Sequence, residues 1–110
     1  MTTPPDISHD RRTPQLLLDL GFHPKLLGFQ QLWVAIDLYA LGNIQSMAKD
    51  LYPIVSEMTD STPTAVEHTI RRSVKYAWNR RDPEVWARYF RDTEKKPSNK
   101  EFIAVLSIWK

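Results

Sequence analysis

Residues 62–81 read TPTAVEHTIRRSVKYAWNRR, and their spacing predicts one amphipathic helix. An α-helix turns about 100° per residue, which gathers the apolar side chains on one face: Val66, Ile70, Val74, Ala77 and Trp78. The polar and basic side chains fall roughly on the opposite face: Thr64, His68, Arg71, Arg72, Lys75 and Asn79. Such a helix buries its apolar stripe and holds its cations toward solvent.

Positive charge is concentrated on this one segment. Residues 64–81 hold five Lys or Arg and a single acidic residue, Glu67, which gives a local charge of +4. The whole chain of 110 residues has a net charge of only +2, so the remaining residues carry −2. A basic face of this kind is typical of a helix that binds nucleic acid. The alternative is a solvated face on a helical bundle whose function lies elsewhere.

The composition excludes several classes of protein. Hydrophobic residues make up 42% of the 110 residues, enough for the core of one domain. The chain has no Cys, which excludes disulfides and thiolate metal sites and fits a reducing cytoplasm. No run approaches the roughly 18–20 apolar residues of a membrane span, and the N-terminus lacks the apolar core of a signal peptide. We therefore expect a cytoplasmic protein with no membrane contact.

Patterns that would indicate catalysis or a cofactor are absent from the sequence. The three histidines, His9, His23 and His68, do not have the spacing of metal ligands. With three Gly in total there is no Gly-rich phosphate loop, and no nucleophile motif or pair of carboxylates stands out. We expect no catalytic residue, no metal site, no cofactor and no enzymatic activity.

Signals for helix starts and stops succeed one another along the chain. Residues 1–12 are polar and predict a flexible tail, and residues 13–110 predict one all-α domain. Thr13 is expected to cap the first helix. Pro24 is expected to open a second helix that Gly42 closes.

The remaining signals predict four more helices, six in all. Asn43 is expected to cap a third helix that runs to Met58, which Pro53 must kink or divide. Inside the second helix, Gly28 predicts a close crossing by another helix. The last three helices are expected to begin at polar capping residues, namely Thr62, Asp82 and Ser98.

The segment from Tyr52 to about Arg80 has the form of a helix-turn-helix, with its recognition helix at about residues 63–80. A helix of this kind fits the major groove of double-stranded DNA, where its N-terminal residues reach base edges. The side chains expected to read bases are Thr64, Glu67, His68 and Arg71. Those expected to contact the phosphate backbone are Arg72, Lys75, Arg80 and Arg81.

Short motifs in one order along residues 16–106 resemble the C-terminal DNA-binding domain of the stage-zero sporulation response regulator of endospore-forming bacteria. They are Leu20-Gly21, Gly28-Phe29, Leu32, Ala35-Ile36, Leu51-Tyr52-Pro53, Val66-Glu67, Ile70-Arg71, Ala77-Trp78-Asn79-Arg80, Phe90, Lys96-Pro97-Ser98-Asn99 and Glu101-Phe102-Ile103-Ala104. The resemblance implies a six-helix fold in a transcription regulator whose fourth helix reads the major groove. It also implies tandem copies on promoter DNA and a place at the bacterial nucleoid.

The resemblance carries over to individual positions. Glu67 and Arg71 match family positions that contact DNA, whereas Ala65 and His68 stand where the family usually has arginines. Loss of two long donors predicts a weaker or redirected reading of bases. Residues 82–91 correspond to the part of the family that touches the RNA polymerase sigma subunit, but their sequence, DPEVWARYFR, departs strongly from it.

The family normally places a phosphorylatable receiver domain ahead of this region, where this chain has a short polar tail. Either the protein is a stand-alone effector or the chain is a piece of something longer. A second function therefore stays open: an interaction module without a receiver, which binds the full-length regulator or RNA polymerase. A third is non-specific coating of nucleic acid.

Overall fold

The computed structural model describes residues 11–92 and 94–110, and within these it is helical with no strand. The elements are α2 (Arg12–Asp19), α3 (Leu27–Leu41), the π-helical turn η1 (Met47–Leu51), α4 (Tyr52–Met58), α5 (Pro63–Asn79), α6 (Pro83–Ala87) and α7 (Asn99–Trp109). Over these residues the expected all-α fold of six helices is confirmed, with η1 as an additional helical turn. Most of the tail predicted over residues 1–12 lies outside the described residues.

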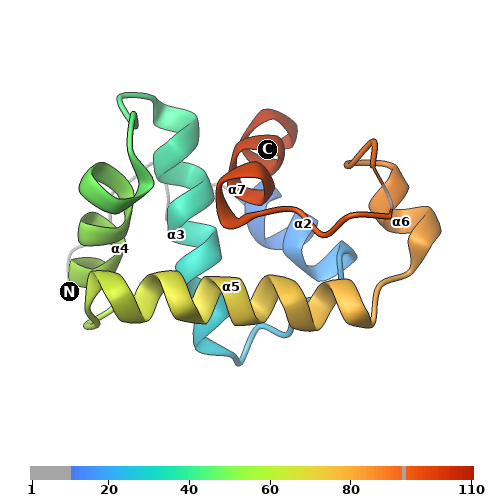
Figure 1. The fold of residues 1–110 in the computed structure, drawn as a ribbon, viewed down its shortest axis with the longest axis horizontal. Helices are drawn as coiled ribbons and strands as arrows, with labels where there is room; N and C mark the ends of the chain where they lie inside the picture. The colour runs from blue at the N-terminus through green and yellow to red at the C-terminus, as the bar shows by residue number, and fades with distance from the viewer. Residues whose placement is uncertain (1–10, 93) are drawn as a thin grey trace.

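Helix α5, with 17 residues, is the longest of the described helices, and the others lie along it (Figure 1). It runs along one side of the molecule, with α4 and α3 beside its N-terminal half and α7, α2 and α6 toward its C-terminal half (Figure 1). The core lies between α5 and these helices. Its fully buried side chains include Leu17, Leu32, Ile36, Val66, Ile70, Val74, Phe102, Ile103 and Leu106.

The expected capping residues of the last three helices are confirmed. Thr62 Oγ1 accepts the amide hydrogen of Ala65 at 3.1 Å, and Asp82 Oδ1 accepts that of Glu84 at 3.0 Å. Ser98 forms the reciprocal capping box with the residue three positions on. Each cap satisfies backbone donors that a helix start leaves without partners.

Thr13 does not cap α2, because the helix begins one residue earlier, at Arg12. Its side chain is buried instead and donates a hydrogen bond to the carboxylate of Asp37 in α3. Trp33 Nε1 donates to the same carboxylate at 3.1 Å, and Lys110 Nζ lies 3.0 Å from it. A buried carboxylate needs such partners, and this need outweighs the local preference of Thr for a cap.

Two other expected helix starts are also wrong. Pro24 lies in a turn closed by the amide of Leu26 bonding the carbonyl of His23 at 3.1 Å, so α3 begins only at Leu27. Asn43 adopts a left-handed φ of 68°, which cannot start a helix. The third helical segment begins later, because Ser46 caps η1 through the amide of Lys49.

The segment expected to form the third helix is divided in two, as Pro53 required: η1 comes first and α4 follows. The Asp50 carboxylate accepts the amides of Gln45 and Ser46 at 2.9 Å each, which closes the start of η1. These two hydrogen bonds lower the pKa of Asp50, because they favour its charged form. The charged Asp50 therefore stabilises the fold at pH values above its ordinary pKa. This stabilisation is lost as the pH falls through the lowered pKa.

The close crossing expected at Gly28 is confirmed. A Cβ built on this glycine would lie 1.9 Å from Ser73 Oγ and 2.9 Å from Ser73 Cβ, both on α5. Helices α3 and α5 therefore touch backbone to side chain at this point. The closeness brings the apolar face of α5 against α3.

We predict that Gly28→Ala destabilises the domain. The gain in helix propensity is about 1 kcal/mol at most, whereas forcing a methyl group into a filled space costs roughly 1–3 kcal/mol. The clash with Ser73 is short enough for the cost to dominate. Urea unfolding should give a lower free energy of unfolding, and Ser73→Ala in the same chain should recover part of the loss. Gln30→Ala, at an exposed position of α3, is the control. A Gly28→Ala domain as stable as the parent would contradict the crossing.

Candidate DNA-binding surface

Helices α4 and α5 are joined by a turn that is held from both sides. The amide of Ser61 donates to the carbonyl of Ser56 at 2.8 Å, and Thr59 Oγ1 donates to the carbonyl of Val55 at 2.7 Å. Gln31 of α3 adds a hydrogen bond of 3.2 Å from Nε2 to the Thr59 hydroxyl. Ser56 is buried where the two helices approach, so a small side chain fits there. These bonds give the helix-turn-helix one geometry.

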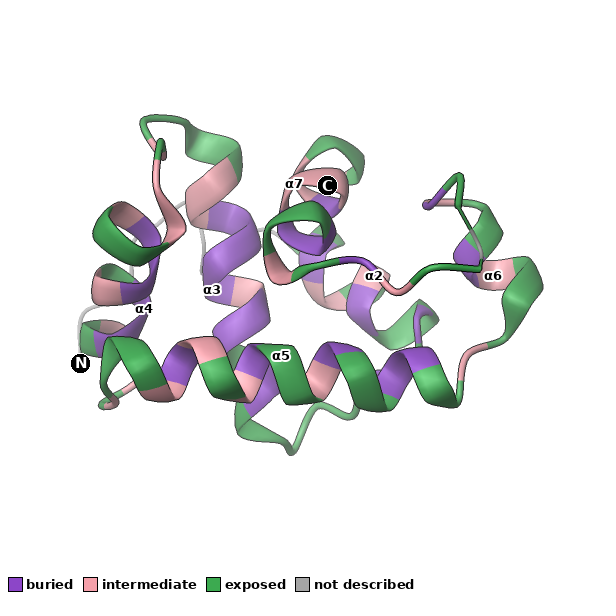
Figure 2. Ribbon diagram, in the orientation of Figure 1, coloured by how far each residue is buried: buried purple, intermediate pink, exposed green. Residues whose placement is uncertain are grey.

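The outer face of α5 is open along its length, as Figure 2 shows. The exposed side chains predicted to meet DNA are Thr64, His68, Arg71, Arg72, Lys75 and Arg80. Behind them Val66, Ile70 and Val74 are completely buried. The amphipathic pattern is confirmed, and the cations face solvent because the opposite side of the same helix is fixed in the core.

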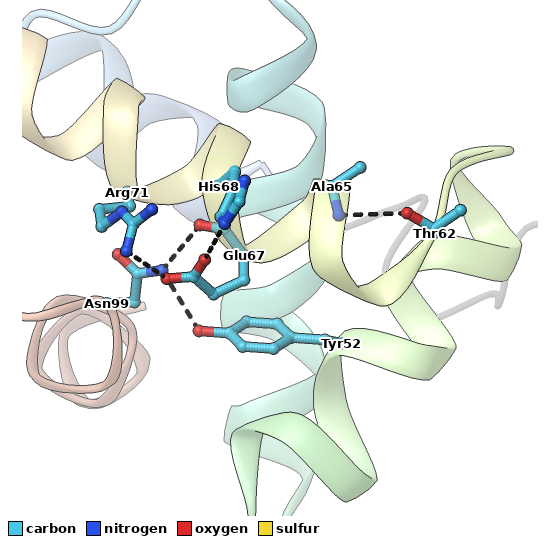
Figure 3. Close-up of polar contacts among 7 residues, drawn as sticks. All are labelled: Tyr52, Thr62, Ala65, Glu67, His68, Arg71 and Asn99. Carbon is cyan, nitrogen blue, oxygen red and sulfur yellow. Dashed lines mark hydrogen bonds and ion pairs between the residues drawn. The ribbon is translucent and has the colours of Figure 1, made fainter.

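Glu67 is half-buried on the flank of α5 that faces α4 and α7. Its Oε1 lies 3.3 Å from Arg71 Nη1, one turn along the helix, and its Oε2 lies 3.4 Å from His68 Nε2. Figure 3 shows the side chains of His68 and Arg71 next to the Glu67 carboxylate. Three of the four side chains predicted to read bases are thus brought together, and in the free protein the charge of Arg71 is engaged by Glu67. The fourth, Thr64, is exposed one turn before them.

The two arginines at the end of α5 have different surroundings. Arg80 is exposed, with its guanidinium carbon 4.6 Å from the ring centroid of Tyr76. Arg81 is half-buried: its guanidinium lies 3.6 Å from the ring of Trp78, and its Nη1 donates to the carbonyl of the same residue at 2.8 Å. Arg81 therefore closes the C-terminal end of α5, where a cation is favourable. This geometry sets it apart from the exposed cations with which the sequence grouped it.

Asn99, the first residue of α7, belongs to the same neighbourhood and was missed as a site residue. Its Nδ2 donates to the hydroxyl of Tyr52 at 3.2 Å and to the carbonyl of Glu67 at 3.1 Å (Figure 3). The capping signal at Ser98 predicted a helix start here. It did not indicate that the next side chain reaches α5, because that contact joins residues 32 positions apart.

Neither a metal-binding cluster nor a membrane span occurs in the described part of the chain. No group of three or more His, Asp or Glu side chains is close enough there to hold an ion. The helices found over residues 11–92 and 94–110 are too short or too polar to cross a bilayer.

Comparison with known families gives a match over most of the domain. The family model described as the C-terminal region of the sporulation initiation factor Spo0A matches residues 13–108 of the 110-residue chain. The matched range holds the helix-turn-helix and its cationic face, and the family is a DNA-binding effector domain. With a helical fold, an outward-facing recognition helix and this match, the chain belongs to the family of the Spo0A C-terminal domain, whose members bind DNA in the regulation of transcription.

Proposed function

We propose that this chain recognises a specific DNA sequence by inserting the N-terminal half of α5 into the major groove. The observation that supports this most strongly is the row of exposed cations on α5, held outward by Val66, Ile70 and Val74. An α-helix with its polar face free is the element that the major groove admits. Since this face is not covered by another described segment, it can approach a duplex without rearrangement (Figure 2).

The side chains proposed to read bases lie in the N-terminal half of α5. Arg71 presents two donors, which suit the O6 and N7 acceptors of guanine, and Glu67 accepts from the amino group of cytosine. Thr64 and His68 lie beside them and assist. Because Glu67 pairs with Arg71 in the free protein, both side chains are already directed to one region of the surface.

The side chains proposed to contact phosphates are Arg72, Lys75 and Arg80, which are all exposed. Contacts of this kind fix the register of a protein on the duplex without reading its sequence. Arg81 belongs to this set by charge, but its guanidinium is held over Trp78. We therefore assign it a long-range electrostatic role at the end of α5.

Two partners and a location complete the proposal. Copies of the domain bind DNA in tandem at the nucleoid of a bacterial cytoplasm, and residues 82–91 form the surface for the RNA polymerase sigma subunit. This segment contains the short helix α6, and its Arg88 and Arg91 are exposed and accessible to a protein partner.

A second candidate function is a protein-interaction module that binds the full-length regulator or RNA polymerase. The observation that favours it is the N-terminal half of α5, where Glu67 engages both His68 and Arg71 and position 65 holds an alanine. This half of α5 therefore offers less free positive charge than the C-terminal half of the same helix.

A selection from random double-stranded DNA, carried out on the purified chain, decides between these functions. Sequence-specific binding predicts an enriched motif, with guanine and cytosine at fixed positions. A flat outcome with measurable binding indicates non-specific coating. If no DNA is retained and a pull-down from the cell's own lysate captures the regulator or polymerase, the interaction module is supported instead.

Arg71→Ala should cost about 1–3 kcal/mol of binding on the selected site and much less on random DNA, because it removes a bidentate base contact. Lys75→Ala is the matched comparison, since it removes a cation one turn further along the same exposed face. It should weaken binding to all sequences alike. It should also reduce the slope of log affinity against log salt by about 0.9, the value for one phosphate contact. Fluorescence anisotropy on both DNAs measures these changes. Equal losses on both DNAs for Arg71→Ala would reject its base-reading role.

Glu67→Gln should tighten binding to random DNA while it weakens the preference for cytosine at one position. The substitution frees Arg71 and His68 from the carboxylate and removes a negative charge next to the phosphates. The gain should be on the order of 1 kcal/mol, the size of exposed ion pairs. Glu57→Gln, which removes a charge from an exposed position of α4, is the control. If Glu67→Gln bound random DNA more weakly than the parent, the carboxylate would not be competing for the cations.

A further inference from the structure

Asn99 joins three helices at the edge of the recognition surface. It is the first residue of α7, and its side-chain amide donates to the Tyr52 hydroxyl of α4 and to the Glu67 carbonyl of α5, at 3.2 and 3.1 Å. Figure 3 shows the amide between these two acceptors. The contact is made to the backbone of α5 and is therefore independent of which side chain occupies position 67.

The backbone of Asn99 is itself firmly placed. Ser98 Oγ accepts the amide of Glu101 at 3.1 Å, and a Glu101 carboxylate oxygen lies 3.4 Å from the amide nitrogen of Ser98. One turn further on, Phe102 and Ile103 are completely buried. The first turn of α7 is thus fixed to the core, and the short side chain of Asn99 connects this turn to α5.

The second acceptor, Tyr52, is fixed as well. Tyr52 is only 7% exposed. Burial raises the pKa of its hydroxyl, which therefore stays protonated at neutral pH. A neutral hydroxyl accepts the Asn99 hydrogen bond and still carries a proton of its own. Asn99 therefore bridges the two helices of the helix-turn-helix from a third helix outside it.

The bonded carbonyl belongs to the turn of α5 that carries the base-reading side chains. In an α-helix the carbonyl of residue 67 also accepts the amide of residue 71, so the backbone under both Glu67 and Arg71 is involved. The core holds this turn from the apolar side, through Val66 and Ile70. Asn99 holds it from the flank, which restrains sliding of α5 and the small rotations that keep the apolar stripe buried.

We propose that Asn99 is a positioning residue for DNA recognition, which fixes the setting of the N-terminal turns of α5 so that base-edge hydrogen bonds form. This inference rests on the proposed function. Base-edge hydrogen bonds require donor–acceptor distances within a few tenths of an ångström, whereas long Lys and Arg side chains follow a displaced phosphate. Loss of Asn99 therefore lowers sequence discrimination more than total affinity.

The test compares Asn99→Ala, Asn99→Asp and Thr13→Val in the full chain. The Asp variant keeps an acceptor for the Tyr52 hydroxyl and places a carboxylate at a helix start, where it is favourable, but it has no donor for the Glu67 carbonyl. Thr13→Val is the control, because the buried hydrogen bond that it removes joins α2 to α3 and not to α5. All three retain the exposed cations.

The main readout is the ratio of affinities for the selected site and a scrambled duplex. Both Asn99 variants should lower this ratio about fivefold or more, the scale of one lost base contact. Affinity for scrambled DNA should change little in the Ala variant. In the Asp variant the added charge should lower the affinity for both duplexes by one further common factor, which leaves the reduced ratio as it is in the Ala variant. Thr13→Val should leave the ratio unchanged, although it lowers the melting temperature.

Amide hydrogen exchange without DNA is the second readout. Both Asn99 variants should speed exchange at residues 67–71, and Thr13→Val should not do so selectively. An unchanged affinity ratio in variants of a parent that does discriminate overturns the proposal, and so does unchanged exchange at these amides. If the parent itself shows no preference between the duplexes, the proposed function is wrong, and so is the role of Asn99 in sequence discrimination. The exchange result then decides whether Asn99 restrains α5.

Discussion

Burial of the apolar stripe of α5 is the constraint on which the rest of the structure depends. Val66, Ile70 and Val74 have no exposed surface, and burying one such side chain is worth roughly 1.5–3 kcal/mol. Successive side chains are separated by about 100°, so this burial also fixes the rotation of α5 about its axis. His68, Arg72 and Lys75 face solvent because no other rotation buries the stripe. The missing side chain of Gly28 lets α3 approach closely enough to complete that burial.

Under the proposed function, one carboxylate within the cationic face sets the balance between affinity and selectivity for DNA. Glu67 lies within 3.5 Å of both Arg71 and His68, where it lowers the local positive charge that attracts any duplex. It also holds the two side chains in one arrangement, which in the proposed DNA complex reduces the entropy lost on binding. A face without this carboxylate would bind phosphate more strongly and discriminate less, since charge alone carries no sequence information.

Parts of the chain outside the helix-turn-helix also hold it in place. Helix α6 has five residues, too few to form alone, and it is held by Trp86, which is buried and donates from Nε1 to the carbonyl of Leu20 at 3.2 Å. The Trp86 ring in turn lies 5.8 Å from that of Phe102 in α7. Helix α7 then reaches back to α5 through Asn99. These contacts therefore connect the end of α2, α6, α7 and α5 in one continuous series.

Local patterns in the sequence were sufficient for the helical class, the recognition helix and the caps at Thr62, Asp82 and Ser98. They also predicted the crossing at Gly28. Each of these depends on the residue pattern along a single helix, or on a residue type that has one main structural use. The match to the Spo0A C-terminal family likewise follows from the sequence, over residues 13–108.

Only the tertiary structure decided where a polar side chain had more than one use. Thr13 has the chemistry of a cap, but a buried Asp37 took its hydroxyl instead. Arg81 has the charge of a phosphate contact, but the ring of Trp78 and the end of α5 hold its guanidinium. Asn99 carries no local signal for its bond to Glu67. These outcomes depend on partners far away in the chain or on the fold around a helix end, and the energy of a polar group is set by the partners that the fold brings to it.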